Sequence, residues 1–480
     1  MTSNPALALR DARTARPSAT RSRCRCAISA AVLVGLVAAL ARPSAGEPAS
    51  PDPGAASAAL VAEGRRRNDA LVKEGFNLTH GFTVDAAHPV RLELLLPPSD
   101  DDELEIALWF EAVRGAFAVR FEAPAGEVIV SWIARRGEQR LTRALPPGRY
   151  VVEVVARDGA IGSGLVGVKG SAIGRCELDP ARVSEHAADP AHGFRWPYLL
   201  ASPSSQAVGV PARPGSNTLL VLPLNTGFNS SELELLRVAA GCQLSSVLAL
   251  ADRLGTPVLV PVFPRPPAPP PEGNLYLHAL SRASLQVRDA ALARVDLQLI
   301  AMIDDARAAL GRTGRKIQPR VLIAGFSAGG MFANRFAVLH PDRTLAASIG
   351  SPGGWPIAPV ADDHGRPLLY PVGVADVEVL TDRRLDRDGL RRVRFLFQLG
   401  DADTNDSVPA LDSFSPASEA LVMQLFGKTP VARWPAAQRL YEAARLRARF
   451  ALYPGVGHSV TPEMGADTEA LFQAALRDPR

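Results

Sequence analysis

The sequence predicts an α/β protein with a doubly wound, mostly parallel sheet from about residue 190 to the end, preceded by a small all-β, sandwich-like domain. Beyond residue 190, short runs of almost continuous apolar residues alternate with helix-length segments, which is typical of strands buried on both faces of a parallel sheet. Between residues 78 and 172, apolar and polar residues alternate in short runs separated by Pro-Gly and Asp-Gly turns. Because no helix-length amphipathic stretch interrupts those runs, the first domain is expected to contain strands alone.

The first 46 residues are typical of a secretory signal peptide. An arginine-rich segment precedes the apolar run AISAAVLVGLVAALA (27–41), and small residues and proline follow it. Fifteen apolar residues are short for a membrane span. We therefore expect cleavage, a secreted or periplasmic mature protein and no stable membrane span after cleavage; an uncleaved anchor is the alternative. Residues 47–77 are expected to form a linker and lead-in.

Net charge argues against a nucleic-acid partner. The chain of 480 residues has a formal net charge of +4, but residues 1–46 hold seven arginines and one aspartate. The remainder is therefore slightly acidic, and nothing in it resembles a basic binding surface.

Two cysteines remain after the signal peptide. Cys176 and Cys242 form an even pair in an oxidising compartment, whereas Cys24 and Cys26 belong to the leader. A disulfide between Cys176 and Cys242 is the prediction, and a pair of reduced, buried cysteines is the alternative.

The second domain contains six recognisable strand-like segments. They lie at 217–224, 256–263, 320–325, 344–350, 392–400 and 449–454. A long helix is expected around 284–311 and a final helix after the last strand. In a doubly wound sheet, ligands bind beyond the carboxyl ends of the strands, so we expect functional residues in the loops that follow these segments.

The loop after the 320–325 segment carries the strongest motif. Residues 325–329 read G-F-S-A-G, the G-x-S-x-G pattern of a nucleophile elbow centred on Ser327. Such a serine lies on a sharp strand-to-helix turn with strained backbone angles, so its neighbours two residues away must be very small. A strand-forming run before the motif and an amphipathic helix ending at Pro341 after it supply the expected context. A glycine-rich turn with a bystander serine is the alternative.

A serine nucleophile needs a base, and the chain offers three histidines after Ser327. His340 ends the following helix in HPDR and is interpreted as a surface histidine, and His364 in ADDHG as part of a solvated turn. His458, in GVGHSV, follows the last strand and precedes the last helix. Because the order along the chain in this architecture is serine, acid, histidine, His458 is the predicted base.

The acid is expected in the stretch FQLGDADTNDSVP (397–409), which contains Asp401, Asp403 and Asp406. A calcium loop is the competing interpretation, with oxygen ligands at alternate positions from Asp401. The sixth position of that loop is Asp406 rather than glycine, the twelfth is Asp412 rather than glutamate, and the flanking helices are missing. We therefore expect no metal.

An oxyanion formed at Ser327 needs backbone N–H donors. One is expected from Ala328, directly after the nucleophile, and the other from Thr226 or Gly227 in the loop L-N-T-G-F after the 217–224 segment. An ordinary asparagine-led turn is the alternative for that loop.

The stretch VLIAGFSAGGMFANRFAVLHPDRTL (321–345) resembles α/β-hydrolases of the secreted esterase, feruloyl-esterase and polyhydroxyalkanoate-depolymerase-like group. SIGSPGGW and GVGHSV are similar to the same group, and the likeness covers about residues 190–480. It implies an α/β-hydrolase fold. The acid of that group commonly lies in G-x-x-D followed by V-P, which here gives Asp403 from Gly400. Val408-Pro409 follows two residues late, so Asp406 stays as the alternative acid.

These features together predict a secreted serine hydrolase that cleaves carboxylic esters through an acyl-enzyme, with Ser327, His458 and Asp403 as its triad. The expected substrate is a small-molecule or polymeric ester, and no cofactor is expected. A serine peptidase or acyltransferase on the same triad, and a non-catalytic surface-binding protein on a hydrolase scaffold, are the alternatives.

Three aromatic residues near the motifs are candidates for the walls of an apolar substrate pocket. They are Phe326, Phe228 and Trp355, and core packing is the alternative for each.

Overall fold

The computed structural model describes residues 66–67, 78–84, 89–96, 104–123, 126–134, 136–143, 145, 148–169, 173–174, 176, 178–204, 217–226, 229–266 and 275–478. The predicted signal peptide (1–46) and most of the predicted linker (47–77) lie outside the described residues.

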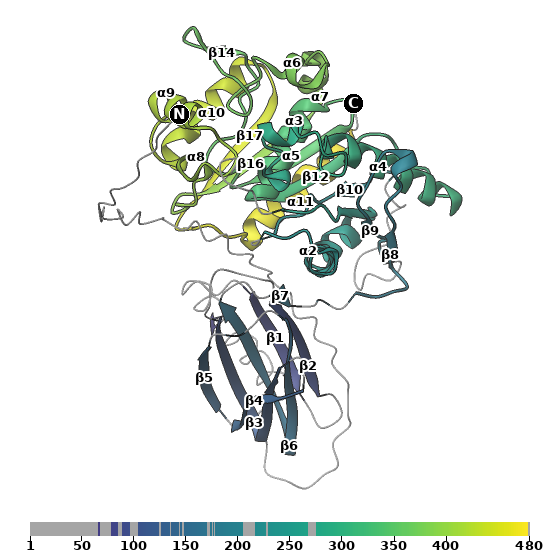
Figure 1. The fold of residues 1–480 in the computed structure, drawn as a ribbon, viewed down its shortest axis with the longest axis vertical. Helices are drawn as coiled ribbons and strands as arrows, with labels where there is room; N and C mark the ends of the chain where they lie inside the picture. Colours follow the sequence, from purple (N-terminus) through teal and green to yellow (C-terminus); the bar gives the residue numbers. More distant parts are fainter. Residues whose placement is uncertain are drawn as a thin grey trace, which may run out of the picture.

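An eight-stranded sheet forms the centre of the second domain (Figure 1). Its strands are β8 (Val183–His186), β9 (Tyr198–Ala201), β10 (Leu220–Val221), β11 (Val258–Pro261), β12 (Val321–Phe326), β13 (Thr344–Gly350), β16 (Arg394–Gly400) and β17 (Arg447–Tyr453). Their order is β17-β16-β13-β12-β10-β11-β9-β8. β9 runs opposite to the other strands and pairs antiparallel with β8 and β11, and the pairs from β11 to β17 are all parallel. This is the sheet of an α/β-hydrolase, so the predicted fold class is confirmed.

Two strands of this sheet were not predicted. β8 and β9 are four residues each and pair with each other and with β11 at one edge of the sheet. Four residues are too few for a periodic pattern, and their position depends on pairing with distant strands. The large sheet therefore begins at Val183 rather than at the predicted boundary of 190.

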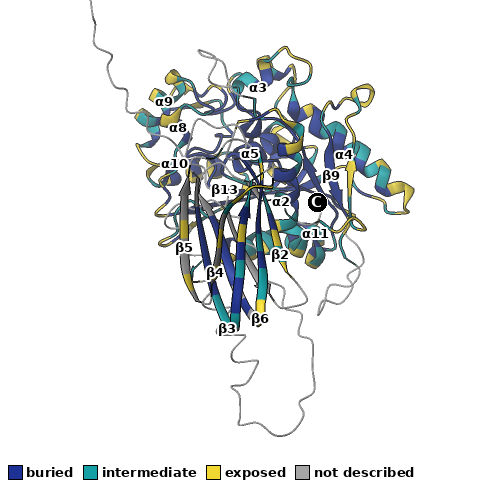
Figure 2. Ribbon diagram, turned by 60° about the horizontal axis from the view of Figure 1, so that its bottom comes forward, coloured by how far each residue is buried: buried dark blue, intermediate teal, exposed yellow. Residues whose placement is uncertain are grey.

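Helices cover both faces of the sheet. On one face α2 (Leu233–Leu254) and α11 (Pro462–Arg477) bury a core with Leu220, Val258 and Leu322. On the other, α4 (Val295–Arg312), α5 (Ala328–Leu339) and α10 (Pro430–Ala443) pack against the alternate residues of the same strands. Figure 2 shows buried residues in the interior of this domain and exposed residues along its outer helices and loops.

Shorter elements complete the second domain. They are η1 (Pro190–His192), η2 (Leu277–Ala279), α3 (Arg282–Gln286), β14 (Asp362–Asp363), β15 (Arg366–Pro367), α6 (Val377–Thr381), α7 (Arg387–Arg392), α8 (Ser407–Ala410) and α9 (Pro416–Phe426). Most of them belong to the connections that follow β11, β13 and β16 along the chain.

The helix predicted around 284–311 is wrong as a single element. It is divided into α3 and α4 by a turn that begins at Asp289, whose carboxylate accepts the N–H of Ala291. Arg294 then takes a left-handed conformation (φ 47°) before α4 starts. Helical periodicity continues across the break, which explains why the sequence pattern did not reveal it.

Helix α2 is, within the described part of the chain, long and apolar enough by composition to cross a membrane. Its buried side packs against the sheet through Leu236, Ala240 and Leu244. That packing accounts for much of its apolar character.

The first domain is an antiparallel sheet built around two long strands. Its strands are β1 (Leu78–Val84), β2 (Val90–Leu96), β3 (Leu104–Glu122), β4 (Val128–Ala134), β5 (Arg136–Arg143), β6 (Gly148–Lys169) and β7 (Ile173–Gly174). The first half of β3 pairs with β5 and the second half with β4, while β6 pairs along both halves. The register shifts where β3 contains Gly115 (φ 70°).

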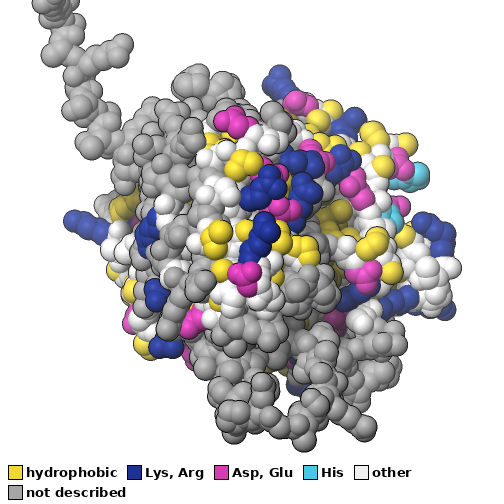
Figure 3. Space-filling view, turned by 90° about the horizontal axis from the view of Figure 1, so that it is seen from below, with side chains coloured by type: hydrophobic (Ala, Val, Ile, Leu, Met, Phe, Trp, Pro, Cys, Tyr) yellow, Lys and Arg dark blue, Asp and Glu magenta, His cyan; other side chains and the backbone are white. Residues whose placement is uncertain are grey.

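Side chains from both halves of these long strands form one core. Leu108 and Phe110 from the first half of β3 belong to the same buried cluster as Phe121 from the second half and Val152 of β6. The all-β, sandwich-like character predicted for the first domain is thus confirmed. Outside the core, Figure 3 shows basic side chains lying beside acidic ones at this end of the molecule, and exposed pairs such as Arg120–Glu153 contribute little to stability.

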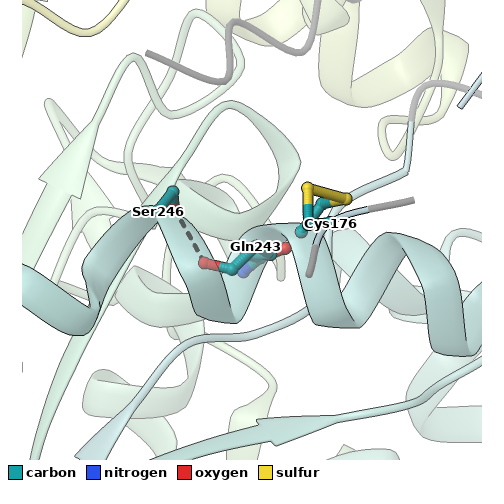
Figure 4. Close-up of a disulfide and its surroundings, with 4 residues drawn as sticks. Cys176, Gln243 and Ser246 are labelled. Atoms are coloured by element: carbon teal, nitrogen blue, oxygen red, sulfur yellow. Dashed lines mark hydrogen bonds between the residues drawn. A yellow bond between two sulfur atoms is a disulfide. The ribbon is translucent and has the colours of Figure 1, made fainter. Parts of the chain in front are cut away.

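The two domains are joined by a disulfide and a small apolar contact. Cys176, just after β7, is bonded to Cys242 in α2, with 4.9 Å between the Cα atoms (Figure 4). Leu95 of β2 also packs against Leu235 and Val238 of α2. Helix α2 is therefore the element of the second domain to which the first domain is attached.

Loss of this disulfide should destabilise the protein. The bond closes a loop with a sequence separation of 66 residues, and a loop of that length corresponds to about 4 kcal/mol of lost unfolded-state entropy. We expect the variant with Cys176→Ser and Cys242→Ser to unfold at a Tm several degrees lower in calorimetry. A reductant should lower the Tm of the wild type and leave that of the variant unchanged; equal Tm values for the two proteins would contradict the prediction.

Candidate active site

Ser327 lies between β12 and α5 in a conformation that few residues adopt. Its φ is 57° and its ψ is −124°, and its N–H donates to the carbonyl of Gly350 at 2.9 Å. A Cβ on Gly325 would lie 2.1 Å from the carbonyl oxygen of Gly329, and one on Gly330 would lie 2.4 Å from that of Gly350. The turn thus requires glycine at these two positions, of which Gly325 is the first glycine of the G-x-S-x-G motif and Gly330 follows the motif directly.

Ala328 is the first residue of α5. The N–H groups of the first helical turn have no acceptor within the helix, and they lie at the positive end of its dipole. The position of Ala328 therefore suits a donor to an anionic oxygen.

His458 and Asp403 meet at the same edge of the sheet, in the loops that follow β17 and β16. His458 Nδ1 lies 2.9 Å from Asp403 Oδ2 and 3.1 Å from Oδ1. The two loops pack backbone against backbone, since Ala402 N–H donates to the carbonyl of Val456 at 3.0 Å and a Cβ on Gly400 would lie 1.9 Å from that same oxygen. The parallel pairing of β16 with β17 therefore determines that these two side chains meet.

The Asp403 carboxylate is held in its charged form. Only 3% of the residue is exposed, and this burial by itself raises the pKa of Asp403, but the hydrogen bond and charge of His458 and the backbone N–H of Asn405 outweigh it. The Ser351 hydroxyl also favours the charged form, although it falls short of good hydrogen-bond geometry. The pKa of Asp403 consequently lies below its usual value.

This pair determines the tautomer of His458. A carboxylate can only accept, so Nδ1 carries the proton and Nε2 of the neutral ring is the acceptor. Nε2 is buried and makes no hydrogen bond to any described residue, Ser327 included. The ring of Phe326 packs beside the imidazole, with 4.8 Å between the centroids. Catalytic hydrogen bonds are often long before substrate binds, so this geometry is compatible with a role for His458 as a base.

Asp406, the alternative acid, has other partners. Its Oδ1 accepts the N–H of Val408 at 3.1 Å, which caps α8, and lies 2.8 Å from Nη1 of the buried Arg433. Asp401 accepts the N–H of Gly455 at 2.6 Å. Among these acids the structure brings Asp403 to His458.

Thr226 is placed differently from the expectation for an oxyanion donor. Its N–H points to Nδ1 of the fully buried His278 at 3.4 Å, and His278 Nε2 donates to the carbonyl of Phe263 at 2.8 Å. Burial lowers the pKa of His278 to about 3, so the ring stays neutral and Nδ1 can accept. Because its N–H already has an acceptor, the geometry argues against Thr226 as the second donor. Gly227 lies outside the described residues.

The aromatic pocket candidates separate into two groups. Trp355 is 1% exposed, stacks on Phe426 at 4.1 Å and donates from Nε1 to the carbonyl of Val372, so it is a core residue rather than a pocket wall. Phe326 is half-buried beside His458. Phe228 lies outside the described residues.

The interpretation of His340 as a surface histidine is wrong. It is buried, and its Nε2 lies 2.8 Å from Oδ2 of Asp296, which Arg294 also contacts. This His–Asp pair lies at the far end of α5 from Ser327. Asp296 is 44 residues away in the sequence, so no local pattern indicated the pairing. His364 lies exposed between β14 and β15, in agreement with a solvated turn.

Comparisons with known proteins add no closer identification. No family model matches the chain, and no curated protein matches it in sequence. Among solved structures, poly(aspartic acid) hydrolase-1 from Sphingomonas sp. KT-1 is similar at 19% identity, with a TM-score of 0.38, over 63% of this chain and 99% of that one. An S-formylglutathione hydrolase from Agrobacterium tumefaciens is similar at 16% identity and a TM-score of 0.34, over 62% of this chain and 94% of that one.

A ferulic acid esterase is similar at 14% identity and a TM-score of 0.32, over 62% of this chain and 97% of that one. At these values the neighbours say nothing about the activity of this chain. The order and direction of its own strands are what establish the α/β-hydrolase fold.

Removal of Asp406 should destabilise the fold. Arg433 is buried, and Asp406→Ala would leave its guanidinium without a counter-ion. Breaking a buried ion pair in this way costs about 3 kcal/mol. Chemical denaturation should show this loss, and an added Arg433→Met should recover most of it. An unchanged midpoint for Asp406→Ala would contradict the structural role given to Asp406.

Proposed function

We propose that this protein is a secreted serine hydrolase that cleaves carboxylic esters through an acyl-enzyme. Ser327 is the nucleophile, His458 the base and Asp403 the acid that orients it. One observation carries the proposal: the buried Asp403–His458 pair stands at the same sheet edge as a serine in a strained strand-to-helix turn. A buried carboxylate paired with a histidine, at the sheet edge that carries a strained serine, suits nucleophilic catalysis.

The proposed reaction begins when Ser327 Oγ attacks the ester carbonyl. His458 Nε2 accepts the serine proton, and Asp403 stabilises the imidazolium that forms. The carbonyl oxygen becomes an oxyanion, the imidazolium then protonates the leaving alcohol, and the acyl group stays on Ser327. Water attacks the acyl-enzyme with the same assistance from His458, which releases the acid and restores the serine. No step of this reaction needs a cofactor or a metal.

Backbone N–H groups are the proposed oxyanion donors. Ala328 is the first, because it follows the nucleophile at the start of α5. With the Thr226 N–H directed at His278, Gly227 is the remaining candidate for the second. Preorganised donors of this kind stabilise the charge that develops in the transition state more than the substrate itself.

Secretion is part of the proposal. The leader has the composition of a signal peptide, and the Cys176–Cys242 disulfide suits an oxidising compartment outside the cytosol. The substrate is proposed to be a small-molecule or polymeric ester. Phe326, half-buried beside His458, is a suitable apolar contact for part of it.

Substitutions of the triad test the proposed function. The wild type should hydrolyse p-nitrophenyl esters and react covalently with a fluorophosphonate probe. Ser327→Ala should abolish both, whereas the distant Ser204→Ala should change neither. Asp403→Asn should lower kcat about 10⁴-fold, because it no longer holds the correct histidine tautomer.

The same assays separate the alternatives. Faster cleavage of peptide amides than of esters indicates a peptidase, and transfer to an added alcohol indicates an acyltransferase. A wild type that neither cleaves short esters nor reacts with the probe would refute the proposal and favour a binding protein.

A further inference from the structure

The loop at 223–226, after β10, lies against the first turn of α5. A Cβ on Gly329 would lie 3.3 Å from the carbonyl oxygen of Pro223 and 3.7 Å from Cβ of Asn225. The side-chain amide of Asn225 donates to the carbonyl of Phe326 at 3.3 Å, one residue before the proposed nucleophile. The position of this loop is therefore coupled to the geometry around Ser327.

Gln243 of α2 holds this loop at two points. Its Nε2 donates to the carbonyl of Pro223 at 2.7 Å, and its Oε1 accepts the N–H of Asn225 at 3.0 Å. The donor faces a carbonyl and the acceptor faces an N–H, so only one orientation of the amide satisfies both contacts. Among the uncharged amino acids, glutamine alone has a side chain of this length that carries both a donor and an acceptor at its end.

Two further side chains hold the next residue of the loop. Arg265 Nη1 donates to the carbonyl of Thr226 at 2.8 Å, and the N–H of Thr226 faces His278. The backbone polar groups of Pro223, Asn225 and Thr226 are thus bound by side chains from outside the loop. The backbone N–H and C=O groups of a loop that pairs with no strand need other hydrogen-bond partners, and here side chains supply them.

The backbone of α2 around Gln243 is itself held in place. The preceding residue, Cys242, is bonded to Cys176 (Figure 4). Leu236, Ala240 and Leu244 pack the same helix onto the sheet. Gln243 therefore reaches the loop from a backbone that has little freedom to move.

We propose that Gln243 is a positioning residue for the oxyanion hole. By holding 223–226 against the first turn of α5, it fixes the backbone around Phe326 and Gly329, between which Ser327 and the proposed donor Ala328 lie. This inference rests on the proposed ester hydrolysis. Because the oxyanion exists only in the transition state, loss of Gln243 should lower kcat and leave KM nearly unchanged.

Gln243→Leu removes both contacts while keeping a similar volume. We expect kcat for a p-nitrophenyl ester to fall about 10- to 100-fold, the effect of displacing a catalytic group by about 1 Å. KM should change by less than about twofold. Backbone hydrogen exchange, measured by mass spectrometry on a peptide covering 219–226, should become faster because the Asn225 N–H loses its acceptor.

The pH dependence of kcat in Gln243→Glu distinguishes a positioning role from a purely structural one. The carboxylate form can accept from Asn225 but cannot donate to Pro223, whereas the protonated form can do both. The ratio of variant to wild-type kcat should therefore rise as pH falls toward the ordinary glutamate pKa of about 4.3. Using the ratio removes any effect of pH that the variant shares with the wild type.

Ser246→Ala is the matched control, since it removes a hydrogen bond to the backbone of Gln243 on the same helix without touching the loop. Its kcat and its exchange at 219–226 should equal those of the wild type. An active wild type with an equally active Gln243→Leu variant, or a kcat ratio for Gln243→Glu that does not change with pH, would overturn the inference alone. A wild type without esterase activity or probe reaction would overturn both the inference and the proposed function.

Discussion

The backbone of Ser327 is the constraint on which the rest of the site depends. A non-glycine residue at φ 57° and ψ −124° is strained by about 1–3 kcal/mol and persists only where its surroundings leave no alternative. Here β13 supplies those surroundings, because Gly350 accepts the Ser327 N–H and also pairs with Phe326 in the sheet. Gly330 allows α5 to start directly beside that strand, where a Cβ would lie 2.4 Å from the Gly350 carbonyl oxygen. The strained turn of Ser327 is thus held by the strand beside it, and the residue itself is buried.

Parallel pairing of β16 with β17 brings Asp403 and His458 together. β16 and β17 are adjacent and in register from Arg394 with Arg447 to Gly400 with Tyr453, so their loops leave the sheet at the same level. Asp403 and His458 lie three and five residues beyond those ends, within reach of each other. A slip of one residue in that register would reverse the faces of every following side chain and separate the pair. The contact at 2.9 Å thus depends on the pairing of a whole strand as much as on the two residues.

The sequence alone was sufficient to predict residues that the local backbone conformation requires. Gly325, where a Cβ would lie 2.1 Å from the carbonyl oxygen of Gly329, and Gly455, with φ 69°, are needed whatever the rest of the fold does. The apolar strands that precede them are equally local. Contacts between distant segments could not be predicted. Asp296, which makes His340 a buried residue, is 44 residues away from it, and the break at Arg294 depends on a left-handed turn within a continuous helical pattern.

The three aspartates that follow β16 lie in one short loop but have different partners. Asp401 binds a backbone N–H, Asp406 faces the permanent cation of Arg433, and Asp403 faces a histidine. An acid beside a permanent cation interacts equally with ground state and transition state, so it can stabilise the fold but not the reaction. In the proposed reaction, the partner of Asp403 gains its charge only when it accepts the serine proton, so the attraction between them strengthens as the transition state is reached. Three chemically identical side chains therefore differ in function through the partners that neighbouring loops bring to them.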